Sequence, residues 1–204
     1  MPGRFTLTGD PTNASDLVRY WLAELSVAPW GRDVEIACGN LFTELKPLIQ
    51  HHFWRFHGDD PTSGLLTAAE DIASYLADNN LPDMDTGRAS QTGPELWLPR
   101  ILVSTGSPDR LDDLTDLVTS RPGRTGVTIV QLTTDDATPS GTRIHLTENG
   151  RVRADVLGFD LVANGITADE AAGCAALLGA ADGINADAAM PDAAEPAADW
   201  QDHC

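Results

Sequence analysis

The apolar positions along the chain alternate between a strand-like and a helix-like period. Short alternating or β-branched runs predict strands at residues 4–8, 33–38, 100–104 and 126–132. Apolar residues three and four apart predict helices at residues 13–28, 63–78 and 107–121. Strands and helices therefore alternate, which predicts an α/β fold with a mainly parallel sheet and helices on both of its faces.

Polar residues where each apolar pattern begins predict the helix caps. Asn13 or Ser15 would cap the first helix, and Ser107, which a proline follows, would cap the helix that begins there. Residues 41–57 have helical spacing broken by a proline, which predicts a short helix or a loop with helical turns. Residues 79–94 are polar and contain glycine, so we expect a loop there.

A hairpin is the strongest local prediction in the last third of the chain. Asn149-Gly150 lies between two alternating segments, at residues 143–147 and 151–156. An Asn-Gly pair in that setting is typical of a tight β-turn. Residues 157–163 would add a further strand.

The chain is predicted to close with one helix and a tail. Thr167 and Glu170 have the three-residue spacing of a capping box, and the helix that follows would run through Ala180. Residues 184–204 consist largely of Ala, Asp and Pro, a composition with few side chains to bury. We therefore expect a single α/β domain at residues 1–183 and a disordered acidic tail or linker at residues 184–204.

The charge balance narrows the choice of partners. The chain has 13 Lys and Arg against 31 Asp and Glu, a formal net charge of −18. Nucleic-acid binding begins with cationic side chains that displace counterions from phosphates, so direct binding to DNA or RNA is not expected.

The cysteines and the hydropathy pattern indicate where in the cell the protein is expected. The three cysteines are far apart and form no C-x-x-C pair, which argues against a disulfide framework and a structural zinc site. No secretory signal and no apolar run of membrane-spanning length occurs, so membrane insertion is not expected either. The sequence predicts a soluble cytoplasmic protein.

Two turns after predicted strands are the candidate ligand-binding site. Helix N-termini at the carboxyl ends of parallel strands can hold an anion. The first turn contains Thr8, Gly9 and Asp10, and the second contains Thr105, Gly106 and Ser107. The chain has neither G-x-x-x-x-G-K-[ST] nor G-x-G-x-x-G, and its one lysine lies outside any glycine-rich segment. A conventional P-loop NTPase is therefore excluded, and a small anion remains the candidate ligand.

Other chemistry finds little support in the sequence. His51, His52 and His57 are the only local group of metal-ligand type, but their spacing does not bring them onto one helix face. No serine stands in a G-x-S-x-G context, and Cys38 and Cys174 are expected to be buried as small apolar residues. We expect no metal, no cofactor and no enzymatic activity.

Several short stretches together resemble known proteins. They are Phe5–Asp10, Trp97–Ser104, Gly126–Val130 and Gly141–Val152. The set is similar to the central α/β region of large actinobacterial proteins that carry a LysM peptidoglycan-binding domain and a bacterial transcriptional activator domain. It resembles, more distantly, the degenerate ATPase-like domains of the FtsK/EssC group. The resemblance implies a degenerate nucleotide-binding fold that serves as a non-catalytic module between membrane-linked and regulatory parts.

Three hypotheses for the function follow from the sequence. The first is a non-catalytic interaction or regulatory domain, which binds a protein partner or neighbouring domains as a module of a larger signalling or transcription-associated protein. The second is a small-molecule or nucleotide-binding protein that uses the cleft at the strand ends. The third is a subunit of a homo-oligomeric assembly.

Overall fold

A seven-stranded sheet forms the centre of the protein. We analysed a computed structural model, which describes residues 3–51, 60–90, 97–106, 108–134 and 141–187. The strands are β1 (Arg4–Gly9), β2 (Glu35–Ala37), β3 (Arg100–Thr105), β4 (Val127–Leu132), β5 (Thr142–Leu146), β6 (Arg151–Ala154) and β7 (Phe159–Val162). Their order in the sheet is β2-β3-β4-β1-β5-β6-β7. The first five strands are parallel and the last two join antiparallel, so the expected α/β fold with a mainly parallel sheet is confirmed.

The strand order places β1 at the point where the chain reverses direction across the sheet. After β1 the chain crosses to the far edge at β2, returns through β3 and β4, and then passes β1 to form β5. Leu7 of β1 pairs with Leu132 of β4 on one side and with Ile144 of β5 on the other. In open α/β sheets, ligands bind outside the carboxyl ends of the strands at such a reversal. The strand order therefore predicts a ligand-binding site at the end of β1.

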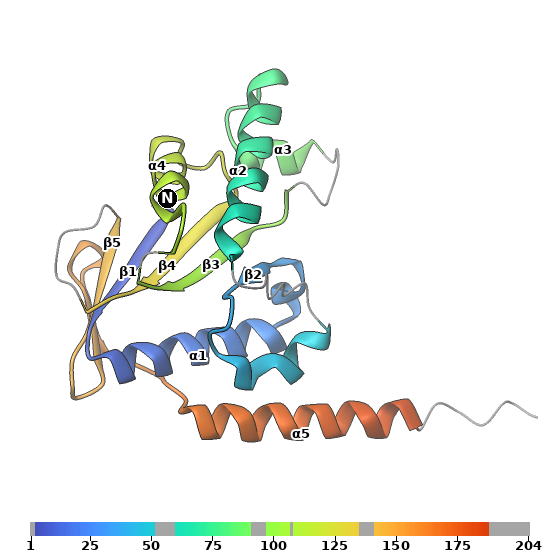
Figure 1. Cartoon of the computed structure of the whole chain (residues 1–204), viewed down its shortest axis with the longest axis vertical. Helices are drawn as coiled ribbons and strands as arrows, with labels where there is room; N and C mark the ends of the chain where they lie inside the picture. The colour runs from blue at the N-terminus through green and yellow to red at the C-terminus, as the bar shows by residue number, and fades with distance from the viewer. Residues whose placement is uncertain (1–2, 52–59, 91–96, 107, 135–140, 188–204) are drawn as a thin grey trace, which may run out of the picture.

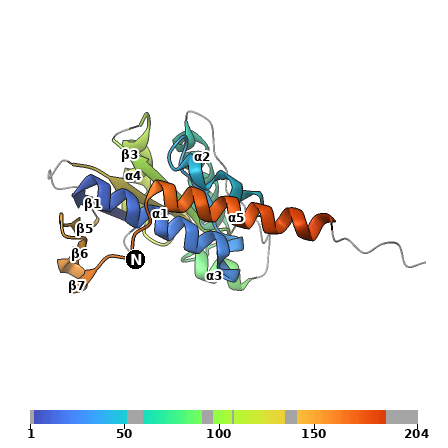
Figure 2. The same cartoon turned by 90° about the horizontal axis from the view of Figure 1, so that it is seen from below.

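Helices cover the two faces of the sheet unequally. They are α1 (Pro11–Val27), α2 (Pro61–Asp78), α3 (Met84–Ala89), α4 (Leu111–Ser120) and α5 (Ala168–Asp187), with 3-10 segments η1 (Pro29–Asp33), η2 (Thr43–His51) and η4 (Asp155–Leu157). Helix α1 lies along one face, with α5 beyond it, and α2 and α4 lie side by side on the other face (Figure 1). Strands β5, β6 and β7 gather at one end of the molecule, away from α2 and α3 (Figure 2).

Two apolar clusters match this arrangement. The larger cluster joins α1 to the sheet through Leu7, Leu17, Val18, Leu22, Ile36, Val103, Val130, Ile144 and Leu146, among others. The second joins α2 and α4 to the sheet through Leu65, Leu66, Leu102, Leu111, Leu114, Val118, Val127 and Ile129, among others. Alternate residues of each strand point to opposite faces, which explains why neighbours such as Leu102 and Val103 belong to different clusters.

The start of two helices differs from the prediction. Helix α1 begins at Pro11 and its cap is Asp10, whose carboxylate accepts from the Asn13 N–H, so Asn13 and Ser15 do not cap it. Asp10 is a better cap because Pro11 suits the first helical position. Helix α4 begins at Leu111 after Arg110, which is in the left-handed conformation, so the predicted start at Ser107 is wrong.

Four further predictions of local structure are confirmed with adjusted ends. The hairpin forms as β5 and β6, the further strand forms as β7, and η2 is the helical turn expected between residues 41 and 57. The capping box is present, because Thr167 Oγ1 accepts from the Glu170 N–H at 3.3 Å and the Glu170 carboxylate accepts from the Thr167 N–H at 2.8 Å.

Two helical segments were not predicted. Residues 84–89 form α3 inside the predicted loop, and α5 continues to Asp187, so residues 184–187 of the predicted tail are helical. Residues 188–204 lie outside the described part of the chain, and the division into domain and tail stays a prediction. None of the described helices is long and apolar enough to cross a membrane.

Candidate functional site at the carboxyl edge of the sheet

The turn between β1 and α1 is tightly packed, and one of its own side chains caps the helix. Gly9 has φ +93°, a conformation that glycine adopts without steric cost. A Cβ at this position would lie 2.0 Å from the Leu146 carbonyl oxygen. Asp10 follows, and its Oδ1 accepts from the Asn13 backbone N–H at 2.7 Å. The N-terminus of α1 is thus occupied by a carboxylate of the same chain, where a bound anion would otherwise receive the N–H groups.

The same turn is tied to the end of β5. The Asp10 N–H donates to the Leu146 carbonyl at 2.9 Å. The Asn13 side-chain amide donates to the Thr147 carbonyl at 2.9 Å and to the Glu148 carbonyl at 3.3 Å. These bonds use backbone acceptors from the turn of the β5–β6 hairpin, so the hairpin and the start of α1 hold each other in place.

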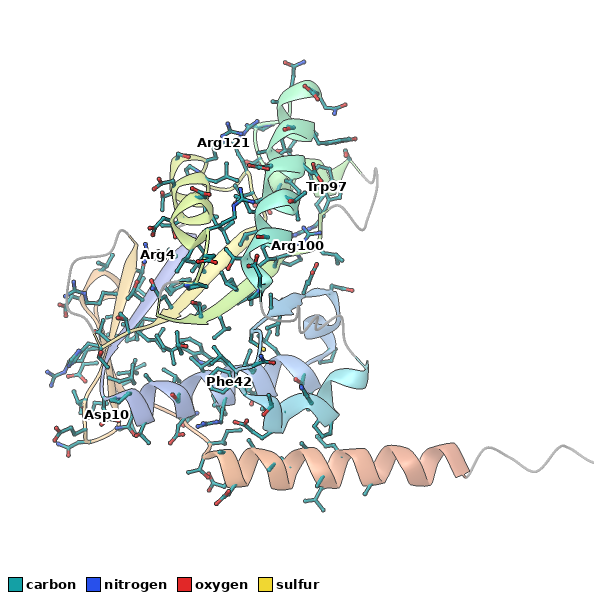
Figure 3. The ribbon with its side chains drawn as sticks, in the orientation of Figure 1. Arg4, Asp10, Phe42, Trp97, Arg100 and Arg121 are labelled. Carbon is teal, nitrogen blue, oxygen red and sulfur yellow. The ribbon has the colours of Figure 1, made fainter. Side chains whose placement is uncertain are left out.

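A shallow depression opens beside this turn. Its volume is about 500 Å³, and its lining residues are Gly9, Asp10, Pro11, His145, Leu146, Thr147, Glu148 and Asn149. Figure 3 shows Asp10 at the start of α1, at the end of the helix that meets the hairpin. Two carboxylates, of Asp10 and Glu148, line the depression, with His145 as its one titratable base. Such a lining repels a phosphate group.

The His145 side chain links β5 to β1 beside the depression. It pairs in register with Thr8, and its Nδ1 lies 3.3 Å from Thr8 Oγ1. Thr8 itself is buried, while His145 is exposed. The predicted residue Thr8 is therefore a structural neighbour of the depression and does not line it.

The turn between β3 and α4 is open but presents no anion site. Thr105 and Gly106 are exposed, and Gly106 has φ +72° with open space around it. The Gly106 carbonyl accepts from the Gln131 side-chain amide at 2.6 Å. The first turn of α4 carries the acidic residues Asp112 and Asp113, which already complement the positive end of the helix dipole. Ser107 lies outside the described residues.

The two turns share an edge of the sheet without converging. Thr105 pairs with Leu132 of β4, and Leu132 pairs with Leu7 of β1, so one strand separates the turns. Two strand spacings amount to about 10 Å. The depression beside Gly9 is lined by the β1 turn and the hairpin, and β3 contributes nothing to it. The six predicted residues therefore do not form one pocket among the described residues, and their role in ligand binding stays a prediction.

A buried polar row inside the sheet was missed in the sequence. Ser104, Gln131 and Thr6 are neighbours in register on adjacent strands, and all three are buried. Gln131 also accepts a short hydrogen bond from Arg4 at the edge of this row. The hydroxyls of Thr6 and Ser104 have no hydrogen-bond partner among the described residues. Polar residues within otherwise apolar strands were the available signal, but only the strand order shows that they form one row.

The other candidate residues lie elsewhere in the fold or outside the described residues. The described residues contain no group of three or more His, Cys, Asp or Glu that could hold a metal ion. His51 ends η2, and His52 and His57 lie outside the described residues. Cys38 is buried as predicted, and burial raises its pKa to about 12. Cys174 is exposed on α5, which corrects the prediction that it is buried.

The two cysteines are expected to differ in their reaction with iodoacetamide. Alkylation requires a thiolate, and the raised pKa and burial of Cys38 suppress both its ionisation and its contact with the reagent. Brief alkylation of the folded protein at pH 8, followed by peptide mass spectrometry, should therefore modify Cys174 at least about tenfold faster than Cys38. In denaturant the two rates should become similar. Equal rates in the folded protein would contradict the burial of Cys38.

The comparison with known proteins shows a structural likeness without a match in sequence. No protein-family model matches the chain, and no curated protein matches it. The chain is similar in structure to Thermomonospora curvata EccC (ATPases 2 and 3), solved in complex with a signal sequence peptide, with a TM-score of 0.58 and 14% identity. The match covers 87% of this chain and 42% of the EccC chain, so the chain spans less than half of the length of that protein.

At this identity the likeness shows the fold alone. The expected, more distant resemblance to ATPase-like domains is confirmed at that level. The resemblance to the central region of proteins with LysM and transcriptional activator domains is matched by no family model and stays a prediction.

Proposed function

We propose that this chain is a non-catalytic interaction domain on an ATPase-like α/β fold, which binds a protein segment and does not hydrolyse nucleotide. The observation that carries the proposal is the Asp10 carboxylate on the N-terminus of α1, bonded to the Asn13 N–H at 2.7 Å. A nucleotide-binding turn at this point would need free N–H groups and a lysine for the outer phosphates. Here the Asn13 N–H donates to the Asp10 carboxylate, and the Asp10 N–H donates to the Leu146 carbonyl at the end of β5.

The surroundings of the turn support this proposal. Glu148 adds a second carboxylate to the depression, and the chain carries a net charge of −18. The one lysine, Lys46, lies on η2 after β2, three strands from β1 in the sheet. The negative charge around the turn would therefore repel a phosphate group, and no lysine lies near the turn to bind it.

The binding of a protein segment is supported by the comparison and by exposed apolar side chains. The EccC structure is a complex with a signal sequence peptide, and we propose that this chain also takes a peptide or protein partner. Leu177 and Leu178 on α5 and Leu161 and Val162 on β7 are exposed. Apolar side chains grouped on a surface are typical of interaction sites. A regulatory place within a larger protein, as the sequence resemblance implies, belongs to the same proposal.

A thermal-shift titration with nucleotides tests the proposal. A ligand that binds the folded state at a hundredfold excess over its dissociation constant adds about 2.7 kcal/mol of stability. We expect no rise in Tm with ATP, ADP or GTP in the presence of Mg²⁺ at millimolar concentrations. A nucleotide-specific rise in Tm would contradict the proposal.

The variant Asp10→Ser refines this test. Serine caps a helix about as well as aspartate does, so the variant removes the charge and keeps an acceptor for the Asn13 N–H. Its Tm without nucleotide should lie close to that of the wild-type protein. A rise with phosphate or nucleotide in Asp10→Ser alone would assign the exclusion of phosphate to the Asp10 carboxylate.

A further inference from the structure

The two edges of the sheet differ in their protection. At one edge, all three residues of β2 are buried. At the other edge, β7 exposes its last three residues, and the exposed fractions of Leu161 and Val162 are 57% and 72%. An edge strand presents a row of N–H and C=O groups that can pair with another chain. We call the exposed side of β7, residues Phe159–Val162, the β7 edge.

The hydrogen bonds between β6 and β7 show which backbone groups face outward. Just after β7, the Ala163 N–H donates to the Gly150 carbonyl at 2.8 Å, so Ala163 points toward β6. In an antiparallel pair, residues that point to the partner strand alternate with residues that point away. Leu161 and Phe159 therefore point their backbone groups toward β6. Asp160 and Val162 point theirs away from the sheet, along the β7 edge.

Exposed apolar side chains lie on β7 and on the turn before it. The described residues include seven exposed large apolar side chains, and four of them belong to η4 and β7. Val156 and Leu157 in η4 are 79% and 53% exposed, at the turn that leads into β7. Natural edge strands are usually protected by charge, proline or a bulge. Here the apolar residues face solvent instead.

The one charged residue of β7 is held back toward the sheet. The Asp160 carboxylate accepts from Arg151 Nε at 2.8 Å and from Arg153 Nε at 3.1 Å, both on β6. The hydrogen bond from Arg151 lowers the pKa of Asp160, so the carboxylate stays ionised and engaged there at neutral pH. The carboxylate therefore does not shield the β7 edge, but Arg151 Nη2 also donates to the Asp160 backbone carbonyl at 3.2 Å, so this carbonyl already has one partner.

We infer that the β7 edge binds an extended, apolar peptide segment of net positive charge, which adds to the sheet as an eighth strand. This inference rests on the proposed function and specifies its binding surface. In strand addition, main-chain hydrogen bonds supply the affinity and alternate side chains supply the specificity. The outward N–H groups of Asp160 and Val162 and the Val162 carbonyl provide the hydrogen bonds, and Val156, Leu157 and Leu161 provide the apolar contacts.

Charge and size select this occupant over a second copy of the chain. Arg151 and Arg153, the cationic side chains beside β7, are both paired with Asp160. The net charge of −18 therefore dominates the approach, so it repels a second copy and attracts a cationic segment. The four exposed apolar residues are also far fewer than the roughly 20–30 residues per partner of a stable dimer interface. A short strand whose backbone is satisfied by β7 does not need such an area.

An NMR titration with a synthetic probe tests the inference. The probe is Lys-Val-Thr-Val-Thr-Val-Lys, whose apolar side chains alternate, and its controls are the same peptide with a central proline or with glutamates at both ends. We expect the amide resonances of Asp160 and Val162 to shift with the lysine-flanked probe. The proline peptide should bind at least about tenfold more weakly, since it loses a donor in the paired strand.

Two variants locate the binding on β7. Val162→Pro removes an outward donor at an edge position where proline is tolerated, and should weaken binding about tenfold. Leu161→Asn keeps the backbone, removes an exposed apolar contact, and should weaken binding severalfold. Val27→Asn removes an equally exposed apolar side chain from α1 and should leave binding unchanged. Raising the salt from about 0.05 M to about 0.5 M should weaken binding of the lysine-flanked probe.

Several results would overturn the inference. They are an absence of binding, equal binding of the glutamate-flanked peptide, unchanged binding by both β7 variants, and sedimentation data showing that β7 joins two copies of the chain. Peptide-induced shifts confined to another surface would overturn the assignment to β7 but leave the proposed function standing. A nucleotide-specific rise in Tm would overturn the proposed function whatever the β7 edge binds.

Discussion

Replacing Gly9 with alanine is expected to destabilise the protein by roughly 3–5 kcal/mol. At φ +93° an L-residue is strained, and the added Cβ would lie 2.0 Å from the Leu146 carbonyl oxygen and 2.8 Å from His145 Cε1. The carbonyl belongs to the backbone of β5 and cannot rotate away as a flexible side chain can. Urea unfolding followed by circular dichroism measures the loss in the free energy of unfolding.

Gly150 provides a matched control for this variant. It has φ +69°, and its Cβ position is open, with nothing within 4 Å. Gly150→Ala should therefore show the conformational strain alone, roughly 1–2 kcal/mol. The difference between the two variants measures the close approach of β1 and β5 at Gly9. Equal losses would mean that the turn after β1 is not packed against β5 as described.

The tight packing of this turn against β5 explains how the chain can have an ATPase-like fold without a phosphate-binding sequence. A phosphate-binding loop needs glycines so that its backbone can approach the ligand. Gly9 uses the same freedom to approach the Leu146 carbonyl, and Asp10 then occupies the helix end. The position that would serve a ligand in a nucleotide-binding protein here serves the packing of the hairpin.

Local patterns in the sequence predicted the elements well because each has a local physical cause. The hairpin at Asn149-Gly150 follows from turn geometry, and the capping box at Thr167 follows from one short spacing. The helix starts were less predictable, since several polar residues compete for each cap. Asp10 is favoured over Asn13 and Ser15 because it directly precedes the proline at the first helical position.

Features that depend on strand order were beyond the reach of local patterns. The row of Ser104, Gln131 and Thr6 exists because β4 lies between β3 and β1, which no spacing along the chain reveals. The separation of the two candidate turns has the same origin. The β7 edge could be expected as a strand but not as an open one, since a strand becomes an edge only when nothing pairs beyond it.

Glu35→Ala is expected to cost about 3 kcal/mol of the free energy of unfolding, because it leaves a largely buried charge without its ion-pair partner. Glu35 Oε2 lies 3.0 Å from Arg100 Nε, and the two side chains are only 10% and 12% exposed. The two residues also face each other in the register of β2 and β3. Since β2 has only three residues, this pair adds to the buried contacts of Ile36 and Ala37 in holding it to the sheet.

Two comparisons separate burial from charge in this prediction. Asp113→Ala breaks the exposed pair with Arg110, whose side chains are 63% and 51% exposed, and should cost less than about 1 kcal/mol. The double variant Glu35→Met with Arg100→Met should recover most of the loss, because a buried pair replaced by apolar residues leaves no unpaired charge.

Since β2 and β7 lie at opposite edges of the sheet, the folded Glu35→Ala variant should still bind the lysine-flanked peptide. A cost for Glu35→Ala no greater than that for Asp113→Ala would show that β2 does not depend on the ion pair.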